Sequence, residues 1–162
     1  MAEKELFFGE DEFLVSKTDT KGRISYGNSL FVKISGYAEA ELLGAPHNIL
    51  RHPKMPKLIF TLLWEHIESG KEIFAYVINR AKNGDFYWVF ANITPSFDGD
   101  GKIIGYHSVR RKPTQEALHI IQPLYAELLR MEEQRGESAA REHLEKLLKT
   151  KGLDYEQFIL SF

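Results

Sequence analysis

The chain has 162 residues, of which 43% are apolar and 27% charged, the profile of a folded protein rather than of a disordered segment. Its 21 Lys and Arg against 23 Asp and Glu leave a net charge of −2, so we expect no nucleic-acid partner. The lack of cysteine excludes disulfides, thiolate metal sites and cysteine nucleophiles. No stretch reaches the ~18 apolar residues of a membrane span, and the acidic N-terminus is unlike a secretion signal. We therefore expect a cytoplasmic protein without direct membrane insertion.

The first third of the chain predicts a β-hairpin followed by short helices. Strands are expected at residues 13–19 and 23–27, joined by a turn that ends at Gly22. Asn28 is placed to cap a short helix, and one or two helical turns follow at residues 38–43. Three prolines within residues 45–56 (APHNILRHPKMP) indicate an irregular but ordered loop.

The middle of the chain predicts a helix and three antiparallel strands. Apolar residues at helical spacing indicate a helix over residues 55–69. Residues 73–81 and 86–96 are rich in strand-forming residues and flank an Asn-Gly turn, the strongest short-range signal for a hairpin. A further turn leads to a last strand at residues 103–111.

The C-terminal part is expected to be helical from Thr114 onward. Leu118, Ile121, Tyr125 and Leu128 form an apolar stripe, while Pro123 is expected to kink or restart the helix. A second amphipathic helix is predicted at residues 137–149, and a last short one after Asp154. The fold class is therefore α+β, with a five-stranded antiparallel sheet, short helices on one face and additional C-terminal helices.

The order of these elements is that of a PAS domain, and several sequence motifs make the resemblance more specific. The phrases ELLGAPHNILRHPKMP, VINRAKNGDFYWVFANITP and GKIIGYHSVRRKPT resemble the flavin-binding PAS domain of bacterial aerotaxis and energy-taxis sensors, the Aer/CetB type. The resemblance runs from about residue 13 to residue 128. We expect an N-terminal leader (residues 1–12), a PAS sensor domain (13–112) and a helical extension (113–162).

The same resemblance implies a signal-transduction protein that binds FAD without a covalent bond and senses redox state or oxygen. In that family the flavin's state is passed to a chemoreceptor-type module. Here that module, a HAMP or methyl-accepting unit, is expected on a separate chain, which makes this a stand-alone form and a possible homodimer. An enzyme is not expected, because no nucleophile motif or phosphate-binding loop is present.

Two of the expected FAD contacts lie in the proline-flanked loop. Arg51 and His52 match the family's Arg-His pair, and the resemblance assigns them to binding FAD, through its diphosphate or by ordering the loop. Without the motif, the same pair is typical of a solvated basic loop. Lys54 stands where the family usually has Asp, which reverses one charge beside the expected phosphate site.

Four further residues are candidate cofactor contacts. Trp64 matches the family's pocket tryptophan, although its spacing also suits a core residue. The amide of Asn79 suits the flavin's pyrimidine edge but also suits a residue that opens a turn. Asn28 matches an Asn tied to FAD binding or simply caps its helix. His107 lies on the last strand, where related flavin domains place a polar group near the ring, or faces outward.

Other ligands and roles are weighed against FAD. Without cysteine, the light-driven flavin adduct of LOV domains is excluded. Haem remains the main rival because one axial histidine suffices, and FMN could replace FAD. No residue spacing predicts a metal site. A cofactor-free interaction module and an oxidoreductase acting on a small substrate also remain open.

Overall fold

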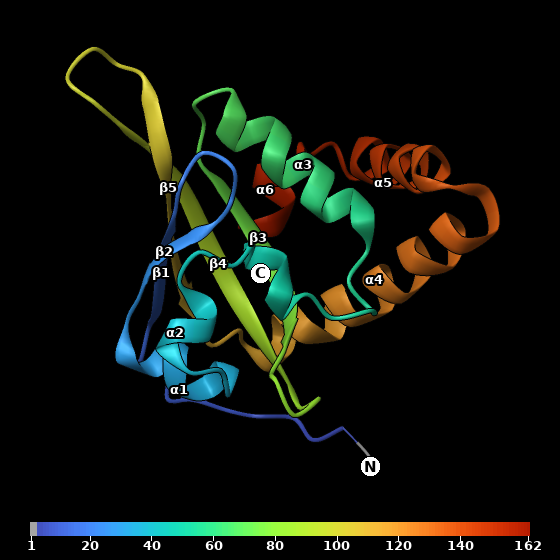
Figure 1. Ribbon diagram of the computed structural model, residues 1–162. Coiled ribbons are helices and arrows are strands. Elements are labelled where there is room, and N and C mark those ends of the chain that lie inside the picture. Colours follow the sequence, from blue (N-terminus) through green and yellow to red (C-terminus); the bar gives the residue numbers. More distant parts are fainter. Residues whose placement is uncertain (1–2) are drawn as a thin grey trace.

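The structure is a computed structural model that describes residues 3–162 (Figure 1). A curved sheet carries small helices and a longer helix, and two long C-terminal helices lie beside that longer helix, on the right of the view (Figure 1). The elements are β1 (Leu14–Thr18), β2 (Ile24–Gly27), α1 (Ser29–Ser35), α2 (Glu39–Leu42), the 3₁₀ helix η1 (His47–Leu50), α3 (Lys57–Glu68), β3 (Ile73–Arg80), β4 (Phe86–Phe97), β5 (Ile103–Arg111), α4 (Gln115–Arg135), α5 (Glu137–Lys151) and α6 (Tyr155–Ile159).

The five strands form one antiparallel sheet in the order β2-β1-β5-β4-β3. The predicted α+β class and five-stranded sheet are confirmed. Gly22 and Gly84 adopt positive φ angles of 81° and 96° in the two hairpin turns, a conformation that other residues adopt at a cost. Pairing of β1 with β5 joins the first and last strands at the centre of the sheet, which brings Ser16 opposite Ser108.

The two faces of the sheet have different neighbours. On the inner face, Val77 pairs with Val89, and Ile73 pairs with Ile93 beneath helix α3. On the outer face, Tyr76 stacks on Phe90 with ring centroids 4.6 Å apart. Because side chains alternate along a strand, each strand contributes to both layers, and β3 is buried on both sides over most of its length.

The C-terminal helices cover the outer face of β3 and β4 and the free edge of β3. The ring of Trp88 packs against Tyr125 of α4. The Tyr125 hydroxyl donates a 2.6 Å hydrogen bond to the carbonyl of Tyr76, and the Tyr155 hydroxyl donates one of 3.1 Å to the carbonyl of Phe74. Two tyrosines thus satisfy carbonyls that β4 leaves unpaired, which protects an edge strand from pairing with other chains.

Helix α4 continues through Pro123 from Gln115 to Arg135, so the predicted restart of the helix is wrong. The apolar stripe on both sides of the proline explains this continuity. Leu118, Ile121 and Leu128 are buried, the last two in the main core cluster, and their packing offsets the missing backbone hydrogen bond.

Candidate functional site

A cavity of about 650 Å³ lies between helix α3 and the inner face of the sheet. Its volume is within the range of small-molecule and cofactor pockets. Its long walls are apolar: α3 contributes one side and the sheet the other. The wall residues are Phe60, Leu63, Trp64 and Ile67 from the helix, and Val77, Ala91, Ile93 and Tyr106 from the strands.

Trp64 forms a flat wall of this cavity. Its ring meets Tyr106 edge-to-face, with centroids 5.6 Å apart. Gly22 lies close to the same indole: an added Cβ would sit 3.1 Å from the ring, and the φ angle of Gly22 is 81°. Glycine is required at this position both for the turn and for the close approach of the indole. The hairpin turn between β1 and β2 therefore fixes where the tryptophan lies.

A buried cationic cluster forms another part of the cavity lining. Arg110 of β5 is only 3% exposed. It donates a 2.6 Å hydrogen bond to the Ser16 hydroxyl and lies 3.1 Å from Nε2 of His47. The Ser16 hydroxyl is also 3.1 Å from the same His47 nitrogen, and the guanidinium lies over the ring of Phe31 at 4.9 Å. These contacts hold the guanidinium in one orientation.

The cluster carries a positive charge at neutral pH. Burial and the adjacent Arg110 lower the pKa of His47 to about 3, so its imidazole is neutral. Burial lowers the pKa of Arg110 to about 10, which still leaves it charged. Within residues 3–162, no carboxylate forms an ion pair with Arg110. A buried cation without a counter-ion favours a ligand with electron-rich or anionic atoms.

Several buried polar atoms of this cluster lack partners. Within the described residues, Nε of Arg110 and the hydroxyls of Ser108 and Tyr87 have no hydrogen-bond partner. Burial also raises the pKa of Tyr87 to about 12, which keeps its hydroxyl protonated. Buried groups of this kind are nearly always paired in folded proteins. Arg110 and Ser108 line the cavity, so a bound molecule is a natural source of the missing partners.

Charged residues from several elements also line the cavity. Arg51, Lys21 and Lys57 are exposed cations, and the Arg51 guanidinium lies over the ring of Phe60 at 4.7 Å. Acidic groups, including Glu137 from helix α5, line it as well. The C-terminal extension therefore contributes directly to the cavity wall.

Three of the six predicted site residues line the cavity. These are Arg51 just after η1, Trp64 on α3 and Asn79 on β3, where the asparagine is almost fully buried. Backbone pairing between Arg51 and Asn79 joins the proline-flanked loop to the edge of the sheet. The exchanged residue Lys54 is exposed and does not contribute to the lining.

The other three predicted residues lie outside the cavity lining. Asn28 caps α1 by accepting from the backbone N–H of Phe31, and it also bonds to β1. His52 is buried, accepts a hydrogen bond from the Lys54 N–H and lies 3.3 Å from Glu3. Its side chain therefore stabilises the loop without facing the cavity. His107 alternates with Tyr106 and Ser108, which line the cavity, and therefore faces the outer side of the sheet.

Sequence reasoning missed the cationic cluster of Ser16, His47, Ser108 and Arg110. One signal was available in the last strand. Its alternation places Tyr106, Ser108 and Arg110 on one face of the sheet. Ser108 and Arg110 are polar, whereas a face packed entirely in the core would carry apolar residues at these positions. The partners from β1 and η1 become neighbours only when the sheet closes.

The cavity between a helix and a five-stranded sheet in the order β2-β1-β5-β4-β3 agrees with the family comparison. The sequence pattern of the PAS fold matches residues 24–110, more than half of the chain. The chain belongs to the PAS family. Over 119 residues it is 44% identical to the aerotaxis receptor of Escherichia coli (strain K12), a match that covers 74% of this chain and 23% of that protein.

More distant PAS relatives include the nitrogen fixation regulatory protein of Klebsiella pneumoniae, 29% identical over 97 residues. That match covers 60% of this chain and 20% of the relative. The PAS chain therefore spans about a quarter or less of the length of these two relatives.

Solved structures agree on the fold. A light-oxygen-voltage domain studied with a flavin analogue superposes with a TM-score of 0.62 at 22% identity, covering 68% of this chain and 84% of that one. The light-state LOV domain of Aureochrome1 gives a TM-score of 0.58 at 22% identity, covering 75% and 91%. Over residues 3–162, no helix has the length and apolar character that crossing a membrane requires.

Proposed function

We propose that this PAS domain binds FAD non-covalently and reports the redox state of the flavin to a chemotaxis signalling protein. The observation that carries the proposal is the buried Arg110 cluster, with its unpaired Nε and the unpaired Ser108 hydroxyl, in a cavity whose long walls are apolar. A flavin ring is flat and apolar on its faces and polar along its pyrimidine edge. The chemistry of this cavity therefore suits a flavin.

The residues assigned to the ring act by positioning and by charge. Trp64 and Ile93 supply apolar surface for the ring faces, and the Asn79 amide both donates and accepts hydrogen bonds. Arg110 donates to electron-rich atoms and keeps its charge at neutral pH. His47 stays neutral beside it and adds no second charge.

When bound, FAD supplies one- and two-electron redox chemistry, and its reduction places additional electrons and a proton on the ring. A fixed cation beside the ring favours the more negative form, so Arg110 is suited to raise the flavin's reduction potential. The Ser16 hydroxyl and His47 keep the guanidinium from moving when the charge changes.

The cations of the cavity suit the diphosphate that distinguishes FAD from riboflavin. Arg51, Lys21 and Lys57 are exposed and come from three separate segments, so their side chains are free to meet phosphate oxygens. FMN carries one phosphate and would use fewer of these contacts. The likeness to the aerotaxis receptor further supports a dinucleotide. In this proposal the protein is a sensor rather than an enzyme.

Haem is less compatible with this cavity. Of the histidines in residues 3–162, His47 is the one that lines it, and its Nε2 faces Arg110 and Ser16. An axial ligand would need that nitrogen free.

The partner surface is proposed to be the open part of the outer sheet face. The C-terminal helices cover β3 and the adjoining part of β4. The remaining outer face, on β1, β2 and β5, exposes Tyr26 and Ile104 and carries Lys17 and His107. A chemoreceptor-type signalling protein on a separate chain or a second copy would dock there.

The test is to purify the protein, record its visible spectrum, release the chromophore by heat and identify it by mass. The proposal expects a two-band yellow flavin spectrum and the mass of FAD. A Soret band would indicate haem instead. A colourless protein that takes up neither FAD nor FMN on reconstitution would refute the proposal.

A further inference from the structure

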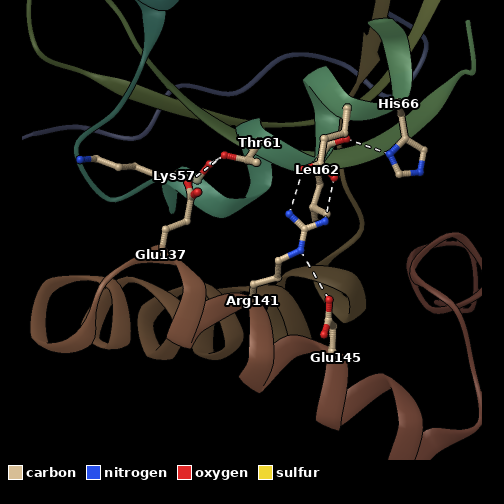
Figure 2. A network of polar contacts seen from close by, with 8 residues as sticks. Lys57, Thr61, Leu62, His66, Glu137, Arg141 and Glu145 are labelled. Atoms are coloured by element: carbon tan, nitrogen blue, oxygen red, sulfur yellow. Dashed lines mark hydrogen bonds and ion pairs between the residues drawn. The ribbon is translucent and has the colours of Figure 1, made fainter. Parts of the chain in front are cut away.

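Helix α3 makes three polar contacts with the C-terminal helices, and Figure 2 shows the two that involve Glu137 and Arg141 of α5. The Glu132 carboxylate accepts hydrogen bonds of 2.9 and 2.8 Å from the backbone N–H groups of Lys57 and Leu58. One turn later the Thr61 hydroxyl donates a 2.8 Å bond to Glu137. The three contacts begin at the N-terminus of α3, where its N–H groups have no partner within the helix.

The third contact is an ion pair with two hydrogen bonds. Arg141 of α5 donates bonds of 2.8 and 2.7 Å to the two carboxylate oxygens of Glu65, and its Nε lies 3.4 Å from Glu145. These bonds lower the pKa of Glu65 and raise that of Arg141. The α3 positions Lys57, Thr61 and Glu65 are four residues apart and therefore lie on one face of the helix.

The same helix forms one wall of the cavity. Phe60, Leu63 and Trp64 line the cavity, and so do Lys57, Thr61 and Glu65, so α3 is shared between the ligand site and the contacts with α4 and α5. Glu137 belongs to both, because it accepts from Thr61 and also lines the cavity. A shift of α3 that accommodates a ligand must therefore lengthen or shorten the hydrogen bonds and the ion pair that join α3 to α4 and α5.

Helices α4 and α5, which together form a helical hairpin, are also attached to the sheet, at strand β3. Tyr125 of α4 bonds to the edge of β3, next to the strand residues that line the cavity. The hairpin of α4 and α5 thus contacts both walls of the site, α3 and β3.

We propose that the α4–α5 hairpin is a strap on helix α3, and that its docking and occupancy of the cavity stabilise each other. Glu132 and Arg141 are positioning residues in this arrangement, because they bond to α3 without lining the cavity. The ligand's identity rests on the proposed function, whereas the docking of the strap does not. Coupling between two sites is reciprocal, so a substitution that loosens the strap weakens binding by the factor by which the ligand strengthens docking.

The first test uses the ligand-free protein and amide hydrogen exchange. Arg141→Glu is expected to raise the exchange of α3 amides at least about tenfold, and Arg141→Lys is expected to restore much of the protection. Lys149→Glu is the matched control, since it makes the same charge change at an exposed position of α5. Unchanged α3 exchange in Arg141→Glu, or an equal rise in the control, overturns the proposal whatever the cavity binds.

The second test titrates FAD into the wild type and Glu132→Ala. Glu132 does not line the cavity, so it acts on the ligand only through α3. We expect FAD to bind about tenfold more weakly to this variant, with Glu132→Gln closer to wild type and Glu133→Ala unchanged. FAD is also expected to slow exchange in α5 by a similar factor. Normal FAD affinity in Glu132→Ala overturns the coupling. Failure of the wild type to take any flavin refutes the proposed function and leaves the exchange test to decide this inference.

Discussion

Replacement of His47 by glutamine is expected to remove much of the protein's loss of stability between pH 7 and pH 5. The imidazole lines the cavity beside Arg110, and its pKa in the folded protein is lowered from 6.5 to about 3. The neutral form is therefore favoured by folding. Below pH 6.5 the unfolded chain binds a proton at this site and the folded protein does not. The resulting stability is present above pH 6.5 and is lost as the pH falls.

The magnitude follows from the linkage relation. Each pH unit below the unfolded pKa costs about 1.4 kcal/mol until the folded pKa is reached. Between pH 7 and pH 5, His47 thus contributes a loss of about 2 kcal/mol. This window lies above the folded pKa, so the result requires only that the folded value stay below 5. Glutamine keeps an amide near Arg110 and Ser16 and does not titrate.

Urea unfolding of the wild type and His47→Gln at both pH values measures the effect. Protonation of carboxylates contributes to both proteins and cancels in the comparison. The free energy of unfolding of the wild type should fall about 2 kcal/mol further than that of the variant. Parallel pH dependence in the two proteins would show that the imidazole titrates as in an unfolded chain, and the description of the cationic cluster would be wrong.

Three further predictions concern the cavity and the extension. Arg110→Met should lower the flavin's midpoint potential by about 40–90 mV, which corresponds to losing roughly 2–4 kcal/mol of charge interaction in a two-electron couple. An unchanged potential, measured by spectroelectrochemistry, would contradict this prediction. Trp64→Leu and Arg51→Ala should each lower the FAD content of the purified, folded protein, and full occupancy in both would refute the site assignment. Tyr125→Phe should lower the free energy of unfolding by about 1–3 kcal/mol, because the Tyr76 carbonyl loses its buried donor; a smaller change in urea denaturation would mean that water replaces it.

The sheet could be predicted because its signals are local. Alternating residues and glycine turns at Gly22 and Gly84 define where strands end, and these depend on neighbours only a few positions away. The apolar stripe of α4 was predicted for the same reason, and its residues are buried. The alternative of a restart at Pro123 was wrong because packing against the core, not the local backbone, decides whether that helix continues.

Site residues were predictable only in part. Arg51, Trp64 and Asn79 come from motifs carried by the resemblance, and all three line the cavity. His52 lies in the same motif, yet its side chain turns behind the loop toward Glu3. A motif gives the position of a residue in the chain, but not the direction in which its side chain points.

By itself, the sequence determined the elements, the class of fold and the family, since hydrophobic periodicity and turn residues act over short distances. The tertiary structure decided which polar groups share a buried environment. Arg110, Ser16 and His47 are far apart in the chain, and pairing of the first and last strands makes them neighbours. It also decided that the C-terminal helices hold α3, because contacts such as Arg141 to Glu65 depend on how two distant surfaces meet. Such contacts have no periodic signal in the sequence, because each depends on the fold of the whole chain.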